Sequence, residues 1–299
     1  MRIVHAVSPR VAAAILVAAF AAGSGAKTPQ PTLDLTQPRS LTASQIVDRN
    51  IAARGGIEAW RQARTMIWIG HLESAHAPDP RMGFVLAQMR PNKSRFELSS
   101  MNQKTWRIFD GEQGWKQRTD SDGRPDVQPF GPQEVKFARQ NLIIDAPLID
   151  LDAHGERAEL EGEEQLDGLP AYRLRVHMAS GERRHVWVDA ATFLDVRYDR
   201  TSYSSSGAAV TVIVKLRDFK SFDGLQIPTM IETGTPLKGG TPDRMVIEHV
   251  SINTALDEQI FERPGLARRG RARDAAERRD TVAPESPGAS RIAGSPTSP

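Results

Sequence analysis

The 299-residue sequence contains no cysteine, and this absence excludes several kinds of site. Disulfide frameworks, zinc sites with thiolate ligands and cysteine nucleophiles all need a residue that the chain lacks. The lipidated cysteine that anchors a bacterial lipoprotein is excluded for the same reason. Any stability must therefore come from packing, hydrogen bonds and ion pairs.

A strong excess of one charge is also absent, because 39 basic residues face 37 acidic ones. The small surplus comes from Arg2 and Arg10 and from a group of arginines after Gly265. Between residues 27 and 264, acidic side chains slightly outnumber basic ones. A nucleic-acid binder would carry a basic surface that follows the phosphates, so no nucleic-acid partner is expected.

The longest apolar run, Val11–Ala22, is too short to span a bilayer, which takes about 20 residues. Arg2 and Arg10 precede it, and the small residues Ser24–Ala26 follow it. This order is typical of a cleaved secretory signal peptide over residues 1–26, with an uncleaved anchor as the alternative. The sequence therefore predicts export to a bacterial periplasm.

Three further segments differ in composition. Residues 27–40 contain three prolines and little to bury, which indicates a linker. Residues 41–264 form the predicted folded domain. Residues 265–299 are rich in Arg, Pro and Ser and contain no aromatic residue, which predicts a disordered tail.

The folded domain is predicted to be mainly β, with two or three helices. Thr42 and Gln45 form a capping box for a first helix that Gly55 and Gly56 end, and a second helix is expected near 132–144. Apolar alternation predicts an antiparallel meander, strongly curved or barrel-like, whose turns include four Asp-Gly dipeptides. The expected strands are 65–72, 82–90, 93–99, 103–109, 113–118, 157–163, 171–178, 182–189, 194–203, 209–220, 226–233 and 244–252.

Two early strands, 65–72 and 82–90, carry apolar side chains on both faces, so both faces must be covered. Helices can cover one face, and either a core or an apolar ligand the other. Packing on both sides without a ligand remains an alternative. If a cavity exists, alternation selects as its lining candidates Trp68, Phe84, Leu86, Phe96 and Trp106.

Motifs for catalysis are missing from the sequence. It contains no nucleophile elbow, no phosphate-binding glycine loop and no dinucleotide fingerprint. His177 and His185 fall on one face of a predicted hairpin, but their expected neighbours Arg183 and Arg175 would repel a metal cation. We therefore predict no enzyme activity, no cofactor and no metal.

Several phrases resemble bacterial outer-membrane lipoprotein-sorting-protein-like domains, over roughly residues 42–264. These phrases are Ala53–Trp60, Phe109–Trp115, Val186–Leu194, Phe219–Pro228 and Ile252–Pro264. The resemblance implies an incomplete antiparallel β-barrel wrapped around helices, as in LolA/LolB-type carriers and RseB-type stress sensors. It also implies an apolar cavity, between sheet and helices, that can hold acyl chains.

Together these observations predict a monomeric, non-catalytic periplasmic protein that carries or senses a lipid or lipoprotein acyl chain. A membrane or envelope protein is expected as a further partner. One alternative is an envelope-stress or regulatory sensor that uses the same fold to bind a protein. A second is a hydrolase whose site the sequence does not reveal.

Overall fold

The computed structural model describes residues 40–101, 103–119, 123–141, 143–203, 208–235 and 240–265. Leu41 begins the structural unit that contains all the described elements. The predicted signal peptide lies outside the described residues, as do the predicted linker except Ser40 and the predicted tail except Gly265. Those three predictions therefore stay predictions.

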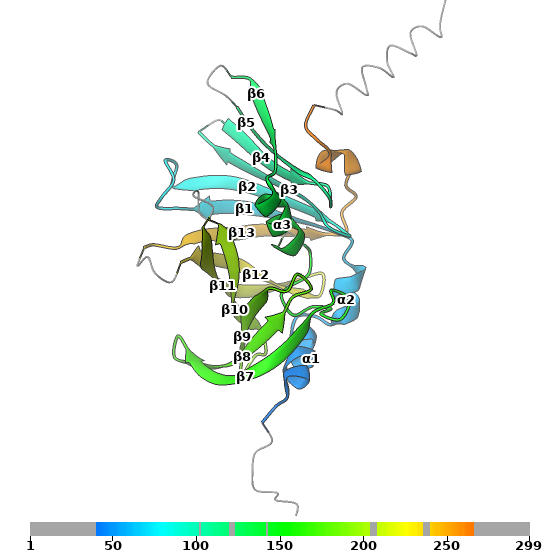
Figure 1. Ribbon diagram of the computed structural model, residues 1–299, viewed down its shortest axis with the longest axis vertical. Helices are drawn as coiled ribbons and strands as arrows, with labels where there is room; N and C mark the ends of the chain where they lie inside the picture. Colours follow the sequence, from blue (N-terminus) through cyan, green and yellow to red (C-terminus); the bar gives the residue numbers. More distant parts are fainter. Residues whose placement is uncertain are drawn as a thin grey trace, which may run out of the picture. The chain divides into compact units, whose positions relative to one another are not determined.

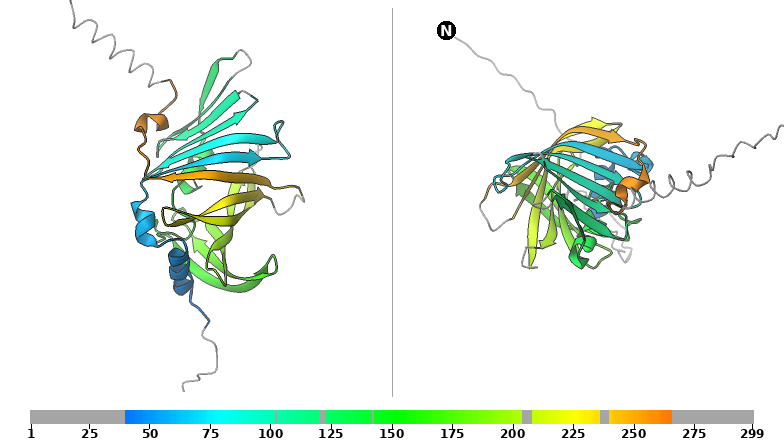
Figure 2. Two further views of the ribbon diagram at one scale, coloured as in Figure 1. Left: turned by 180° about the vertical axis from the view of Figure 1, so that it is seen from behind. Right: turned by 90° about the horizontal axis from the view of Figure 1, so that it is seen from above.

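A single antiparallel sheet of thirteen strands forms the domain, in the order β6-β5-β4-β3-β2-β1-β13-β12-β11-β10-β9-β8-β7. Its edges are β6 and β7, so the sheet is open, and it is strongly twisted (Figures 1 and 2). This confirms the predicted fold class. The strands are β1 (Thr65–Glu73), β2 (Arg81–Met89), β3 (Lys93–Ser100), β4 (Gln103–Phe109), β5 (Gly114–Thr119), β6 (Pro125–Pro129), β7 (Arg157–Leu166), β8 (Leu169–His177), β9 (Arg183–Asp189), β10 (Asp195–Tyr203), β11 (Ala209–Phe222), β12 (Leu225–Gly234) and β13 (Asp243–Ile252).

The pairing follows the chain with one exception. Consecutive strands pair with each other throughout the chain, except that β6 does not pair with β7. The first and last strands, β1 and β13, pair with each other in the middle of the sheet. Turn chemistry explains the local pairs. At Asp167-Gly168 and Asp223-Gly224 both residues have positive φ, as a tight type I′ hairpin turn requires.

Four short helices accompany the sheet: α1 (Ala43–Ala53), α2 (Ile57–Gln62), α3 (Pro132–Asn141) and the 3₁₀-helix η1 (Glu258–Phe261). The predicted capping box of α1 is present, with Thr42 and Gln45 bonded to each other's backbone N–H. Helix α2 and strand β6 were not predicted. The proline at each end of β6 hid an edge strand, because proline donates no ladder hydrogen bond.

Helix α3 and residues 143–156 lead from edge strand β6 to edge strand β7, and we call this stretch the crossing segment. Figure 1 shows α3 lying over one face of the sheet, the inner face. Arg107 and Lys116, on β4 and β5, bind Glu134 of α3 at 2.8 and 3.1 Å. The Gln88 amide donates to the Ile143 carbonyl at 2.8 Å. The crossing segment is therefore fastened to the inner face of the strands that precede it.

The core lies on the inner face in two main clusters. One packs α2 and the crossing segment against the central strands through residues that include Trp60, Phe84, Ile144 and Ile227. The other packs Ile46 of α1 and part of the crossing segment against β8 and β9. Both halves of the sheet are thus covered by elements on the same face.

A buried polar network joins α1 to the sheet and brings together several of the phrases noted in the sequence. Arg54, 1% exposed, binds both carboxylate oxygens of Asp195, 0% exposed, at 2.6 and 2.7 Å. It also donates to the Gln226 carbonyl at 2.7 Å. Asn50 adds a bond of 3.1 Å to Asp195. The phrases Ala53–Trp60 and Phe219–Pro228 therefore contribute contacts that hold α1 against the sheet.

Candidate ligand-binding cavity

A cavity of about 240 Å³ lies between the inner face of the sheet and the crossing segment. Strands from both halves of the sheet form one wall, and α3 with residues 143–147 forms the other. Its lining is mainly apolar and includes Trp60, Trp68, Leu86, Phe137, Ile143, Ile144, Val214, Leu216, Ile227, Ile231 and Met245. Such a space suits an apolar group.

The five sequence-predicted lining residues are divided between two faces. Trp68 and Leu86 line the cavity, and they are register partners on β1 and β2. Phe84 and Phe96 lie on the same face and stack with ring centroids 5.9 Å apart, but neither lines the cavity. Trp106 lies on the opposite, outer face, opposite Glu97, to which its indole N–H donates at 2.8 Å.

Sequence reasoning missed the lining from the second half of the sheet. Val214 and Leu216 on β11 and Ile231 on β12 face the cavity from strands that were predicted correctly. Their alternation with Lys215 and Arg217 was a usable signal for a one-sided apolar face. The part of the crossing segment beyond α3 carried no periodic signal, so its contribution could not be found in this way.

Three charged side chains also reach the cavity wall, and two of them are neutralised. Arg54 is held by Asp195. Asp145 receives hydrogen bonds from Arg90 and from His154. Burial acts to raise the pKa of Asp145, but the hydrogen bonds from His154 and Arg90 bring that pKa below its ordinary value.

The third charged group, Arg200 on β10, is placed differently. Its guanidinium carbon lies 4.9 Å from the centroid of the Phe137 ring on α3. No carboxylate of the described residues lies within ion-pair distance of it. Burial lowers the pKa of Arg200 most; Tyr198 acts to raise that pKa, and repulsion from Arg184 acts to lower it. An arginine remains a cation at neutral pH even so, and the cavity therefore carries one cation without a counter-ion in the described chain.

The wall also contains a hydrogen-bond donor with no acceptor. The indole nitrogen of Trp68 is buried, and no described residue accepts from it. Buried polar groups are nearly always hydrogen-bonded, because an unsatisfied one costs about 1–3 kcal/mol. The mainly apolar lining therefore presents two polar groups, the Trp68 indole N–H and the Arg200 guanidinium, that have no acceptor or counter-ion among the described residues.

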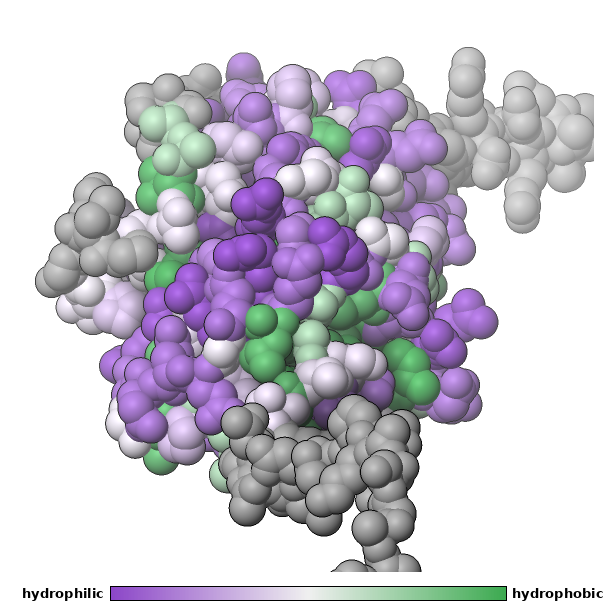
Figure 3. Space-filling model, turned by 60° about the horizontal axis from the view of Figure 1, so that its bottom comes forward, coloured by the Kyte–Doolittle hydropathy of each residue, from purple (hydrophilic) through white to green (hydrophobic). Residues whose placement is uncertain are grey.

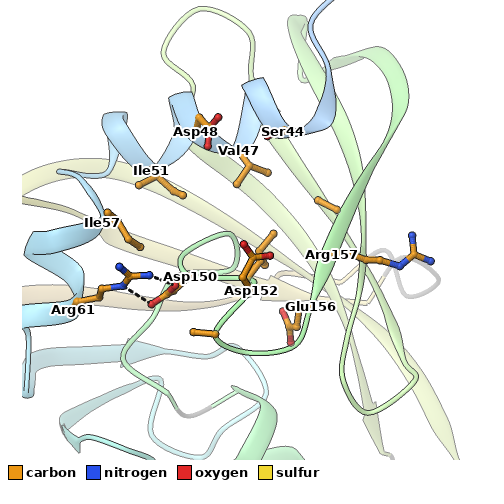
Figure 4. Close-up of a pocket in the computed structure, with 13 residues that line it drawn as sticks. Ser44, Val47, Asp48, Ile51, Ile57, Arg61, Asp150, Asp152, Glu156 and Arg157 are labelled. Atoms are coloured by element: carbon orange, nitrogen blue, oxygen red, sulfur yellow. Dashed lines mark hydrogen bonds and ion pairs between the residues drawn. The ribbon is translucent and has the colours of Figure 1, made fainter.

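A larger and more open groove, of about 750 Å³, lies between α1, α2 and residues 150–158 (Figure 4). Val47, Ile51 and Ile57 point into it from the helices, and Arg61 binds Asp150 at 2.8 Å. Hydrogen bonding to Arg61 lowers the pKa of Asp150. The groove also carries the charged side chains of Asp48, Asp152, Glu156 and Arg157. This mixed lining suits an apolar chain less well than the inner cavity does.

One more pocket, of about 340 Å³, is lined by residues of β7, β8, β10 and β11 and their turns, among them the charged Asp167, Lys215 and Arg217. On the face drawn in Figure 3, hydrophilic side chains predominate and apolar ones form small separate patches. Within the described part of the chain, no three His, Asp or Glu side chains gather in a way that could hold a metal ion. No helix among the described residues has the length and apolarity needed to cross a membrane.

Comparison with known proteins gives similarity at the level of structure only. No protein-family profile matches the chain, and no curated protein sequence does. A LolA superfamily protein from Nitrosomonas europaea is 14% identical over 75% of this chain and 98% of its own, with a TM-score of 0.49. A DUF1329 family protein from Desulfovibrio piger ATCC 29098 is 13% identical over 74% and 97%, with a TM-score of 0.48.

A third similar structure is a domain from Vibrio parahaemolyticus assigned to outer membrane lipoprotein sorting. It is 13% identical over 73% of this chain and 94% of its own, with a TM-score of 0.46. The matched structures include the class of protein that the sequence phrases resemble. At these identities the likeness concerns the fold alone.

Proposed function

We propose that this chain is a non-catalytic binding protein of the bacterial periplasm that holds an acyl chain of a lipid or lipoprotein. The observation that carries the proposal is the apolar cavity between the inner face and the crossing segment. Both halves of the sheet contribute to its wall, so the fold as a whole shapes it. The export signal predicted for residues 1–26 supports the periplasmic location.

The size of the cavity limits the ligand. At about 240 Å³ it is smaller than the roughly 300–1,000 Å³ of sites for drug-sized molecules, so it suits a single chain. Burial of apolar surface supplies the binding free energy, at about 25 cal/mol per Å² before the cost of ordering the ligand. In this proposal Trp68 and Leu86 contact the acyl chain, and Phe84 and Phe96 pack next to them on the same face of the sheet.

The unsatisfied indole N–H of Trp68 favours a ligand that is not purely hydrocarbon. An ester, amide or carboxyl oxygen would supply the acceptor that the described residues do not. Lipids and lipoprotein acyl groups carry such an oxygen at the end of the chain. Trp106, on the outer face, takes no part in this site.

Calorimetric titration with decanoate tests the proposal. We expect saturable binding with a negative heat-capacity change, which marks burial of apolar surface. Ile231→Trp fills the cavity from β12 and should abolish binding. Ile69→Trp is the matched control, because Ile69 lies on the outer face, 41% exposed, and should bind as wild type does. Thermal melts establish that each variant is folded.

A second variant introduces a negative charge on the same cavity wall. Leu86→Glu places a carboxylate where the acyl chain of the ligand should lie, and a buried unpaired charge costs several kcal/mol. If the cavity is hydrated when empty, the variant should fold and lose decanoate. Wild-type protein that binds no fatty acid or fatty alcohol would contradict the proposal. A protein co-purifying in stoichiometric amount, with no lipid detected by mass spectrometry, would favour the sensor alternative.

A further inference from the structure

The charge balance of the cavity wall is the starting point. Of the three charged groups that reach it, Arg54 and Asp145 have opposite charges bound to them, at Asp195 and Arg90 respectively. Arg200 instead has an aromatic ring, Phe137, against its guanidinium. An apolar site that keeps one cation without a counter-ion in the described chain is complementary to an anion.

The nearby carboxylates do not alter this balance. Glu182, which lines a small adjoining space with Arg200, is bound by Lys136 at 2.6 Å. Glu156 lies beside Arg184 in another adjoining space, and burial raises its pKa. Neither of them forms an ion pair with Arg200. The guanidinium therefore keeps its donors for a group that enters the cavity.

Resting on the proposed function, we infer that the ligand is a single-chain amphiphile with an anionic head, and that Arg200 binds this head while the apolar walls hold the chain. A guanidinium presents a planar set of donors that matches the oxygens of a carboxylate or a phosphate. The ring of Phe137 lies against the guanidinium on one side. The inner-face position of Arg200 on β10, whose register partner on β11 is Val212, places it on the cavity wall.

The test compares ligands that share a chain and differ in the head: decanoate, decyl phosphate and decanol, titrated at one pH and ionic strength. Wild type should bind at least one of the anions about tenfold more tightly than decanol, a gap of about 1.4 kcal/mol. The two anions distinguish a carboxylate head from a phosphate head. In Arg200→Gln the anion should bind no better than decanol, and decanol should bind as it does to wild type.

Arg197→Gln is the matched control. Arg197 is on the same strand and also rests on an aromatic ring, 4.2 Å from the centroid of Trp187, but it does so on the outer face. Its anion preference should equal that of wild type. If Arg200→Gln fails to fold, Arg200→Lys keeps the charge without the planar donors and should retain only part of the preference.

Two results would overturn the inference while leaving the proposed function standing. One is wild-type protein that binds decanol as tightly as both anions. The other is a folded Arg200→Gln protein that keeps the full preference for an anion. If wild type binds none of the three ligands, the proposed function itself fails, and the two failures are therefore distinguishable.

Discussion

At the scale of single residues, the phrases that resemble lipoprotein-sorting-like domains supply contacts that stabilise the fold. Arg54 lies in one of these phrases and Asp195 directly follows another, far along the chain, and the two form one buried ion pair. The Trp60 indole donates to the Arg54 carbonyl, so the chain around the pair is also fixed. Such a pair is costly to break on one side, because the remaining charge stays buried without a partner.

We predict that Arg54→Met lowers the free energy of unfolding by about 3–5 kcal/mol, because it leaves the Asp195 carboxylate buried and unpaired. Arg61→Met, at the solvent-exposed pair with Asp150, should cost much less, because water screens an exposed ion pair. Urea unfolding measures both. Equal losses in the two variants would show that burial does not govern the Arg54 pair.

Residue-level prediction from sequence succeeded where the signal was local. Thr42 and Gln45 cap α1 as expected, because their interaction spans three residues. The face of Trp106 could not be obtained in this way. A shift of one residue moves every side chain of a strand to the other face, and only the pairing of Glu97 with Trp106 fixes that register.

At the scale of elements, the crossing segment depends on a small group of charges at its end. His154 binds Asp145, and Asp145 is also bound by Arg90 of the β2–β3 connection. The hydrogen bond to Asp145 raises the pKa of His154 above its ordinary value. Protonated His154 therefore stabilises the folded chain.

The pH dependence follows from that sign. The contribution of His154 is complete below its unfolded pKa of about 6.5 and is lost as pH rises through the higher folded value. We predict that stability falls as pH rises above about 6.5 and through the higher folded pKa, and that His154→Gln removes most of this fall. The exposed His249 provides the control, and His249→Gln should behave as wild type. Urea unfolding across this range gives the answer, and an unchanged slope in His154→Gln would contradict the prediction.

Gly70 on β1, where that strand pairs with β13, and Gly83 on β2 give a matched comparison of two strand glycines. A Cβ at Gly70 would lie 1.9 Å from the Val246 carbonyl oxygen, beside the irregularity in this pairing. A Cβ at Gly83, on the neighbouring strand, would meet nothing within 4 Å.

Gly70→Ala should therefore destabilise the fold by about 3 kcal/mol, because backbone must move to admit the methyl group. Gly83→Ala should be neutral or stabilising by up to about 1 kcal/mol, since alanine restricts the unfolded chain. Thermal or urea unfolding measures the stability of the two variants relative to wild type. A destabilised Gly83→Ala protein would indicate that the loss of glycine itself, and not the close contact, is responsible.

Element prediction was most complete for the strands, because hairpins place sequence neighbours beside each other. All twelve predicted strands are present within a few residues of their expected bounds. The missed strand, β6, pairs only with β5 and carries no apolar alternation. Helix α2 was missed because its six residues are too few for a helical period to show.

At the scale of the whole molecule, the described elements all lie between Leu41 and Gly265. Residues 27–40 and 266–299 offer little to bury by composition, and ordering them would cost about 1–2 kcal/mol per residue for the backbone alone. We predict that a protein of residues 41–265 unfolds at the same temperature as one of residues 27–299. Calorimetry compares them, and a clearly lower midpoint for the shorter protein would show that the flanking residues contribute to the fold.

The same scale explains why the cavity was only partly foreseen. Its lining combines residues from β1, β2, β10, β11, β12 and β13 with the crossing segment, and no sequence window contains more than a fraction of them. Alternation identifies which residues share a face within one strand. The curvature that brings the two halves of the sheet around one space depends on the complete order of strands.

The pairing of the first strand with the last has a consequence for biosynthesis. A ribosome makes β1 early and β13 at the end, so the β1 edge that will receive β13 stays unpaired while nearly the whole domain is synthesised. That edge belongs to an apolar strand, and exposed edges of this kind promote association between chains. Protection of this edge until the final strand is made would therefore favour correct folding.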